Sequence, residues 1–260
     1  MNEKCLIIGH LNIEDLLTIN GIIRYYSTKY IITYLLCKID NLKSIVQMYS
    51  DNKSIIPIAI DTNNYYISND SDSDSNYIYN IYSEIDIIKL GVHNNNWFLL
   101  KSDLLIGNLP YSFFKTFYQQ IDLEYDSRYI HEKINRNHLN ELNFYNSVSV
   151  SVSVSVSLSV IDLNKKYIFS TINDKHIKQN INKNPIFNPK TNNIKSDNLL
   201  DYSYILENAH EIHVNYCDFF ALCVFLDLSN VKNKYIYTNI SNIKDYHKST
   251  KDWTLIYDNE

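Results

Sequence analysis

The feature that most constrains the fold is a strand–helix alternation that runs through the chain twice. Short apolar runs at 5–8, 31–36 and 55–60 are separated by segments whose apolar positions recur at helical spacing. Two further runs, 167–170 and 211–214, repeat the pattern after a long joint. Strands separated by helices of this length form right-handed βαβ crossovers, which align the strands in parallel. The chain is therefore predicted to be α/β, with one parallel sheet in each half.

The helical segments follow from the same spacing. Apolar residues recur from Glu14 to Tyr30, which predicts one helix opened by Asn12 or Asp15. A second helix is expected from Asn41, as its cap, to Tyr49. The pattern also predicts helices over 110–121, 127–146, 199–208 and 218–228, and closing strands over 234–238 and 253–257.

Composition narrows the class of protein. Hydrophobic residues make up 45% of 260 residues, which is typical of a globular chain. The net charge of −5 and the scattered basic residues argue against a nucleic-acid partner, since phosphate binding needs a basic stripe. No apolar run reaches the roughly 20 residues of a membrane span, and none resembles a signal peptide. The four cysteines form no CxxC pair, so neither disulfides nor a zinc site are expected. These features indicate a cytoplasmic protein.

Two low-complexity segments interrupt the alternation. The stretch 62–76 contains alternating Asp and Ser over 70–75, but it lacks the Gly and Glu of a calcium loop, so we expect a solvated acidic loop without metal. Residues 147–160 are Ser-Val dipeptides with one Leu, a pattern that suits a strand and also arises by replication slippage. We interpret this tract as an insertion between an N-terminal domain, 1–146, and a C-terminal domain, 161–260.

Ligands of parallel α/β sheets bind beyond the carboxyl ends of the strands. Two junctions of this kind stand out, Gly9–Asp15 after the first strand and Val214–Phe219 after a strand of the second half. Because helix N-termini favour anions, a phosphate-bearing ligand is expected at one of them. No P-loop, HExxH or GxSxG motif occurs, and no DxD motif ends a strand.

A series of short motifs lies, in order, along nearly the whole chain. Gly9–Asp15 reads Gly-His-Leu-Asn-Ile-Glu-Asp, and Asn20–Arg24 reads Asn-Gly-Ile-Ile-Arg. The series continues with Tyr34–Lys38, Gln47–Asp51, Phe117–Gln120 with Arg128 beyond it, and Tyr204–His213. Together they resemble the glycosyltransferase-like proteins of large DNA viruses, which are distantly akin to heptosyltransferases of the GT-B fold.

The resemblance implies two Rossmann-like halves in a GT-B-like fold, with the acceptor on the N-terminal side and the donor on the C-terminal side. It implies metal-independent transfer of a sugar from a nucleotide-sugar donor to an unknown acceptor, with no cofactor, in the cytoplasm (the host's, if the chain is viral). The residues implied are His10 and Asp15 for catalysis, Asn20 and Arg24 on the first helix, and Asp174, Lys175, His176, Glu207, Cys217 and Asp218 for the donor.

Structural alternatives stand beside these roles. Asp15 also suits a helix N-terminus, and Arg24 either binds a phosphate or covers a sheet edge. Glu207 either holds the donor ribose or packs against its apolar neighbours. His213, inside a strand, is predicted to be a hydrogen-bonded core residue.

Departures from the family pattern lie where phosphate would bind. Two glycines of the family's first loop are here Asn12 and Glu14, which restrict close backbone approach. At the second junction the family has Asp-Ser-Ser-Phe, whereas this chain has Tyr216-Cys217-Asp218-Phe219. A carboxylate at Asp218 repels a diphosphate. The sequence therefore predicts a transferase with reduced or lost activity, or a non-catalytic binding or structural protein on the same fold; an unrelated nucleotide-binding module is a third reading.

Overall fold

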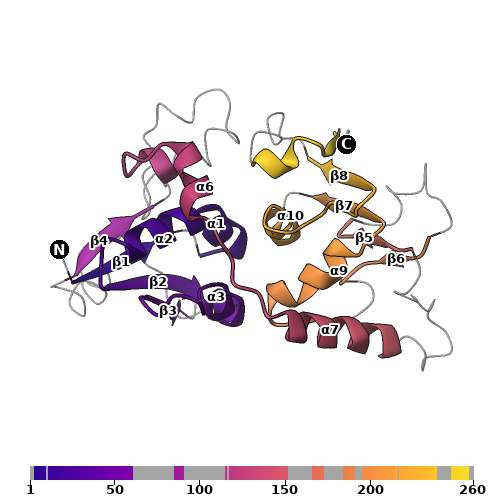
Figure 1. Ribbon diagram of the computed structural model, residues 1–260, viewed down its shortest axis with the longest axis horizontal. Helices are drawn as coiled ribbons and strands as arrows, with labels where there is room; N and C mark the ends of the chain where they lie inside the picture. Colours follow the sequence, from indigo (N-terminus) through magenta and orange to yellow (C-terminus); the bar gives the residue numbers. More distant parts are fainter. Residues whose placement is uncertain are drawn as a thin grey trace, which may run out of the picture. The chain divides into compact units, whose positions relative to one another are not determined.

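The computed structural model describes residues 3–9, 11–60, 85–90, 115, 117–151, 166–172, 184–190, 195–215, 217–238 and 247–257. The chain divides into two compact units, Met1–Asn135 and Arg136–Glu260, and the described part of each combines a parallel sheet with helices (Figure 1). The predicted α/β class, with one parallel sheet in each half, is confirmed.

The sheet of the first unit has the strand order β3-β2-β1-β4, and every neighbouring pair is parallel. Its strands are β1 (Lys4–Ile8), β2 (Ile32–Lys38), β3 (Ile55–Ile60) and β4 (Asp86–Lys89). The side chains of Leu6, Ile8 and Leu36 form an apolar cluster on the sheet, where Leu11 and Ile58 pack against them. Leu11 therefore helps to hold the loop that follows β1 against the sheet.

The helical elements of the first unit whose bounds the structure gives are α1 (Ile13–Thr18), α2 (Asn20–Ser27), the 3-10 turn Ile39–Asn41, α3 (Leu42–Met48), the 3-10 turn Tyr125–Ser127 and α6 (Arg128–His131). The single helix predicted from Glu14 to Tyr30 is wrong, because Ile19 separates α1 from α2. Ile19 leaves helical geometry, at φ −90° and ψ 10°, while its side chain stays fully buried near Gly9. The break lets both short helices keep apolar faces on the core.

The second unit has a five-stranded parallel sheet with the order β6-β5-β7-β8-β9. Its strands are β5 (Ile168–Ser170), β6 (Ile186–Phe187), β7 (Glu211–Asn215), β8 (Asn233–Tyr237) and β9 (Thr254–Ile256). Four of them match predicted strands, whereas no strand was predicted at β6. Its two residues are too short a run to give a strand pattern.

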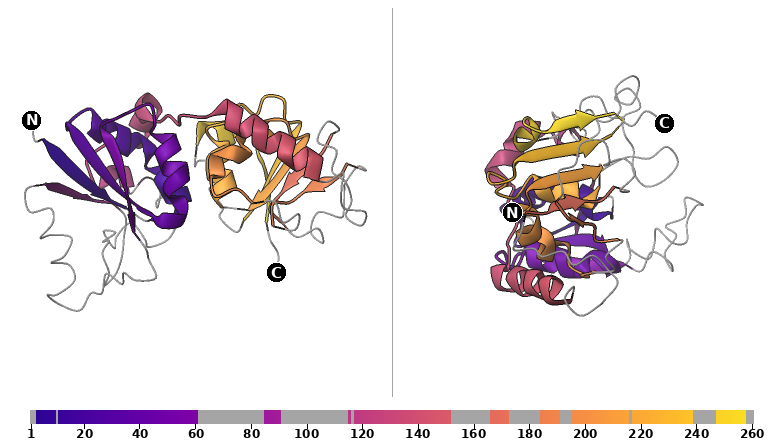
Figure 2. Two further views of the ribbon diagram at one scale, coloured as in Figure 1. Left: turned by 90° about the horizontal axis from the view of Figure 1, so that it is seen from below. Right: turned by 90° about the vertical axis from the view of Figure 1, so that its right-hand side faces the viewer.

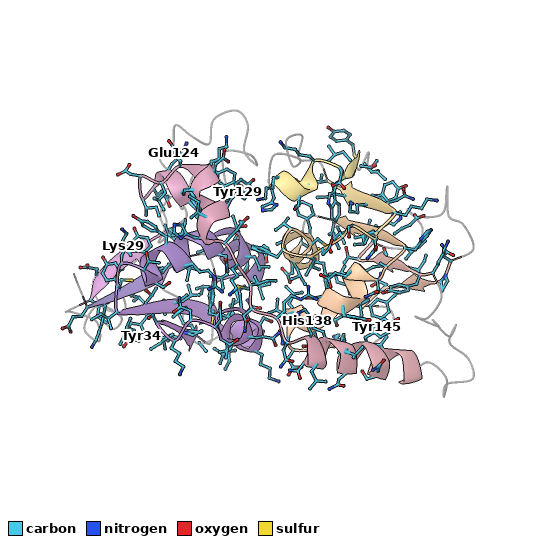
Figure 3. All side chains as sticks on the ribbon, in the orientation of Figure 1. Lys29, Tyr34, Glu124, Tyr129, His138 and Tyr145 are labelled. Carbon is cyan, nitrogen blue, oxygen red and sulfur yellow. The ribbon has the colours of Figure 1, made fainter. Side chains whose placement is uncertain are left out.

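The helical elements of the second unit are α7 (His138–Ser151), the 3-10 turn Leu199–Tyr202, α9 (Ser203–Glu207), α10 (Asp218–Cys223) and the 3-10 turn Lys248–Thr250. Aromatic side chains join them: Phe219 on α10 contacts Phe169 of β5 edge-on, with ring centres 5.2 Å apart. Helix α7 runs along α9 (Figures 1 and 2). Tyr145 on α7, labelled in Figure 3, meets Tyr204 edge-on with ring centres 5.0 Å apart.

The middle of the chain differs from the predicted helix over 127–146. Helix α6 ends at His131, residues 132–137 are non-helical, and α7 begins at His138. The boundary between the two compact units lies between Asn135 and Arg136, whereas the sequence analysis placed the end of the first domain at residue 146. Helix α7 also takes in the first five residues of the Ser-Val tract, 147–151, and Val148 is 1% exposed.

Several expectations fall outside the described residues, among them the acidic loop, the rest of the Ser-Val tract and most of the helix expected over 110–121. All four cysteines are described and free, and Cys5, Cys37 and Cys223 are buried. Across the part of the chain that the structure describes, no helix is long and apolar enough to cross a membrane.

Candidate functional site

The first candidate region is the loop that follows β1. Lys38, the last residue of β2, donates a hydrogen bond from Nζ to Asn12 Oδ1, and Asn41 Nδ2 donates to the carbonyl of Leu11 at 3.1 Å. Both asparagines were expected as helix caps, yet neither makes a side-chain cap bond. Their side chains instead fasten the loop to the carboxyl end of β2. His10 lies outside the described residues.

Asp15 lies in the first turn of α1 and is 7% exposed. Its backbone carbonyl accepts a hydrogen bond from Ile19 N at 2.9 Å, which closes the helix before the break. A base for an acceptor hydroxyl must come within hydrogen-bond reach of that hydroxyl. The low exposure of Asp15 fits a structural carboxylate at least as well, and its catalytic role stays a prediction.

Asn20 and Arg24 lie one turn apart on α2 and bind the backbone of a distant segment. Asn20 Oδ1 accepts a hydrogen bond from Lys133 N at 2.8 Å, and Arg24 Nε donates to the carbonyl of Lys133 at 2.7 Å. Arg24 Nη2 also donates to the carbonyl of Met48 at 3.0 Å and pairs with Asp51 Oδ1 at 2.9 Å. These contacts occupy the guanidinium within the first unit.

The carboxyl of Asp51 completes this arrangement. Partial burial raises its pKa, but the hydrogen bonds from Arg24 and Lys133 outweigh that effect and leave the pKa below its ordinary value. Lys133 Nζ lies 2.7 Å from Asp51 Oδ2. Asp51 is therefore an ionised acceptor shared by two cations.

Gly21 brings two further motifs against the same helix. A Cβ at this position would lie 2.9 Å from the hydroxyl of Tyr118 and 3.0 Å from the Cα of Arg128. Tyr118 in turn donates to the carbonyl of Thr18 at 3.2 Å. The segments Asn20–Arg24, Gln47–Asp51 and Phe117–Gln120, with Arg128, thus assemble around α2. Their shared role in this structure is packing.

Glu207, at the end of α9, lies beside an arginine that sequence reasoning did not single out. Arg136 Nη2 donates to Glu207 Oε2 at 2.8 Å and to Glu141 Oε2 at 2.6 Å, and Arg136 Nη1 pairs with Glu207 Oε1. Asp227 N also donates to Glu207 Oε1, at 3.1 Å. Burial lowers the pKa of Arg136, but the two carboxylates outweigh it and raise the pKa. Both carboxylate oxygens of Glu207 thus accept hydrogen bonds within the second unit.

The second candidate region follows β7. Cys217 occupies the N-cap position of α10, and Asp218 is the first helical residue. Burial raises the pKa of the Cys217 thiol. At the same edge of the sheet, Thr171 Oγ1 donates to Asn215 Oδ1 at 2.8 Å, which joins the ends of β5 and β7. Asp174, Lys175 and His176, the other expected donor residues, lie outside the described residues.

His213 is a hydrogen-bonded core residue, as predicted. Its Nδ1 lies 3.0 Å from the hydroxyl of Tyr237, its Nε2 lies 3.4 Å from Glu211 Oε2, and its ring lies 4.5 Å from that of Tyr235. Burial lowers the pKa of His213, and the neighbouring Glu211 offsets part of that shift. His213 therefore has the environment of a neutral imidazole.

The arrangement of the sheets matches a known enzyme structure over the whole chain. The chain is similar to the glycosyl transferase family 9 from Veillonella parvula DSM 2008, with a TM-score of 0.55 and 11% identity, covering 100% of this chain and 88% of that one. The fold is glycosyltransferase-like. At this identity the likeness concerns the fold alone. No protein-family model matches the sequence, and no curated protein matches it.

The described residues contain no group of three or more His, Cys, Asp or Glu side chains placed to hold a metal ion.

Proposed function

We propose that this chain is a glycosyltransferase-like protein that binds a nucleotide-sugar donor through its second unit and an acceptor through its first. The observation that carries the proposal is the full-length likeness to a glycosyl transferase of family 9. In parallel α/β units, ligands bind at the carboxyl ends of the strands, where the Gly9 loop and the start of α10 lie. Fold alone does not fix function, so the site residues below belong to the proposal.

In the proposed reaction a carboxylate or imidazole takes the proton of the acceptor hydroxyl as the oxygen attacks the sugar carbon. Asp15 and His10 are the candidates for this base. The leaving nucleoside diphosphate needs amides or cations close to its developing charge. Asp174, Lys175, His176, Cys217 and Asp218 are the proposed donor contacts, and no metal takes part.

Within this proposal, transfer is reduced or lost. Three of the proposed residues, Asn20, Arg24 and Glu207, already hold internal partners. At the donor end, the carboxylate of Asp218 stands in the first turn of α10. Two like charges about 4 Å apart repel by on the order of 1–4 kcal/mol between bulk water and surface screening. This corresponds to a roughly five- to several-hundred-fold loss of diphosphate affinity.

The same contacts favour a second candidate function, a non-catalytic binding protein on the transferase fold. Asn12 stands where the related family has glycine, and its side chain is bound by Lys38. This alternative predicts binding of a sugar or a sugar-bearing partner without turnover.

Isothermal titration calorimetry with a panel of nucleoside-diphosphate sugars tests both candidate functions. The unmodified chain is expected to bind weakly, and Asp218→Ser is expected to bind at least about fivefold more tightly, because a repulsive charge is removed. Asp252→Ser, on an exposed side chain just before the amino end of β9 and so at the opposite edge of the sheet from the start of α10, is the matched control and is expected to leave binding unchanged. Micromolar binding by the unmodified chain with no gain in Asp218→Ser overturns the argument for lost activity. No binding by either variant contradicts a donor site.

A further inference from the structure

The segment that connects the two units, residues 132–137, is fastened at both ends by side chains from well-separated parts of the sequence. On the side of the first unit, the backbone of Lys133 is bound twice, by Asn20 Oδ1 at 2.8 Å and by Arg24 Nε at 2.7 Å. Asn20 is fully buried and Arg24 is 8% exposed. These two bonds fix the amide and the carbonyl of the same residue.

The fastening continues to the last residue of the first unit. Asn135 N donates to the carbonyl of Met48 at 2.9 Å, and Asn135 Nδ2 donates to Ser50 Oγ at 2.7 Å. Glu132 N closes the other end by donating to the carbonyl of Arg128 at 2.7 Å. The chain is therefore bound to the first unit from residue 132 to the amide of residue 135.

The very next residue belongs to the second unit. Arg136 Nε and Nη2 both donate to the carboxylate of Glu141, at 3.0 and 2.6 Å, and the same guanidinium pairs with Glu207. The Glu141 side chain is completely buried. Asn137, just before α7, then accepts a hydrogen bond from Asn140 N through its side-chain oxygen at 3.1 Å. The contacts to the first unit end at Asn135, and the contacts within the second unit begin at the next residue, Arg136.

We infer that the two units are joined by a pivot whose rotation is confined to the backbone between the amide of Asn135 and the side-chain anchor of Arg136. Hinges in proteins are a few residues that absorb changes in φ and ψ while the chain on either side stays fixed. Here the hydrogen bonds specify which residues are fixed. Asn20, Arg24 and Glu207 all hold this connection, and the inference does not depend on the proposed transferase activity.

A pair of glycine substitutions tests the pivot in the full chain. Asn135→Gly frees the backbone at the pivot, while Lys133→Gly frees a residue whose amide and carbonyl are both bound. Each variant also loses one side-chain contact, to Ser50 or to Asp51, so the two are matched. Spin labels on Lys53→Cys and Lys251→Cys report one position in each unit, in a Cys217→Ser background that leaves only buried native cysteines.

Distance distributions between the two labels, measured by double electron–electron resonance, give the result. Asn135→Gly is expected to broaden the distribution relative to the unsubstituted labelled chain, and Lys133→Gly is expected to leave its width unchanged. Equal broadening in both variants overturns the inference, because the connection would then be slack throughout. An unchanged width in both also overturns it, because the units would be held by other contacts.

Hydrogen exchange on the unmodified protein supplies a test that needs no variant. The amides of Lys133 and Asn135 are expected to exchange slowly, since each donates to an acceptor of the first unit. Exchange at the rate of an unstructured peptide at these two positions would overturn the fastening and, with it, the pivot.

Discussion

Arg24 donates two hydrogen bonds to the carboxylate of Asp51, at 2.9 Å to one oxygen and 3.4 Å to the other. The side chains are 10% and 21% exposed, so water reaches the carboxylate of Asp51 more readily than the guanidinium of Arg24. The same guanidinium lies over the ring of Tyr49, 5.2 Å from its centre. An arginine with this set of partners fixes the local structure, and its substitution should be measured first as a change in stability.

Replacing Arg24 with Ala is expected to lower the free energy of unfolding by about 1–3 kcal/mol, because the charge-assisted hydrogen bonds to Asp51 and to the carbonyls of Met48 and Lys133 are lost. Urea unfolding followed by circular dichroism measures the change. Lys29→Ala, on an exposed lysine of the next turn, is the control and should alter stability by less than about 0.5 kcal/mol. Equal effects in the two variants would contradict the structural role of Arg24.

Gly21 is expected to resist substitution even though it lies inside a helix. Alanine is better than glycine there by about 1 kcal/mol in helix propensity. Its Cβ, however, would meet the Tyr118 hydroxyl at 2.9 Å and the Arg128 backbone at 3.0 Å, so Gly21→Ala should destabilise by about 1–3 kcal/mol.

Gly9→Ala is the matched comparison for Gly21→Ala. Its Cβ would meet only the far end of the Ile19 side chain, which is able to shift. Thermal unfolding of the two variants should therefore show a smaller loss for Gly9→Ala. The reverse order would mean that α2 does not approach Tyr118 and Arg128 this closely.

We expect substitutions of Arg136 and Glu141 to have non-additive effects on the free energy of unfolding. Arg136→Met should cost about 3–5 kcal/mol, because Glu141 stays behind as a buried charge. Adding Glu141→Met removes that charge, so the double variant should be more stable than Arg136→Met alone. Urea denaturation of the single and double variants measures the coupling. Simple addition of the two losses would show that Glu141 is not desolvated.

His213 predicts a stability loss on mild acidification. Its pKa in the folded protein lies below the ordinary value, so the unfolded chain binds a proton first as the pH falls through about 6.5. The free energy of unfolding should therefore decrease from about pH 7 towards pH 5. His213→Gln should flatten this dependence in denaturant titrations at each pH. An unchanged slope would place the titrating group elsewhere.

Most of the strands were predictable from the sequence because each belongs to a short run rich in apolar residues, whether or not all of its side chains are buried. β3 has the predicted ends, and β1 and β7 differ from the prediction by one residue. The helix break at Ile19 was not predictable, since an isoleucine carries no signal that ends a helix. The break depends on tertiary packing that the spacing of apolar residues cannot reveal.

The candidate site was less accessible to sequence reasoning for a different reason. Asn20 and Arg24 were chosen for a motif, but their partners Met48 and Lys133 bind them through backbone atoms, which no side-chain pattern records. Arg136 was missed because one of its carboxylates, Glu207, lies 71 positions further along the chain. Only the proximity of Arg136 to Glu141, at the start of a helical segment, offered a local signal.

The burial of Val148 near the end of α7 has a consequence for how the gene is able to change. A two-residue repeat does not match the 3.6 residues per turn of a helix, so its valines cannot all lie on the same face of the helix. Which valine packs depends on its distance along the chain from the helix start at His138. When replication adds or removes a Ser-Val unit, the next unit takes the vacated place and position 148 is again valine. A change in the copy number of this tract would therefore leave the same residue type packed at position 148.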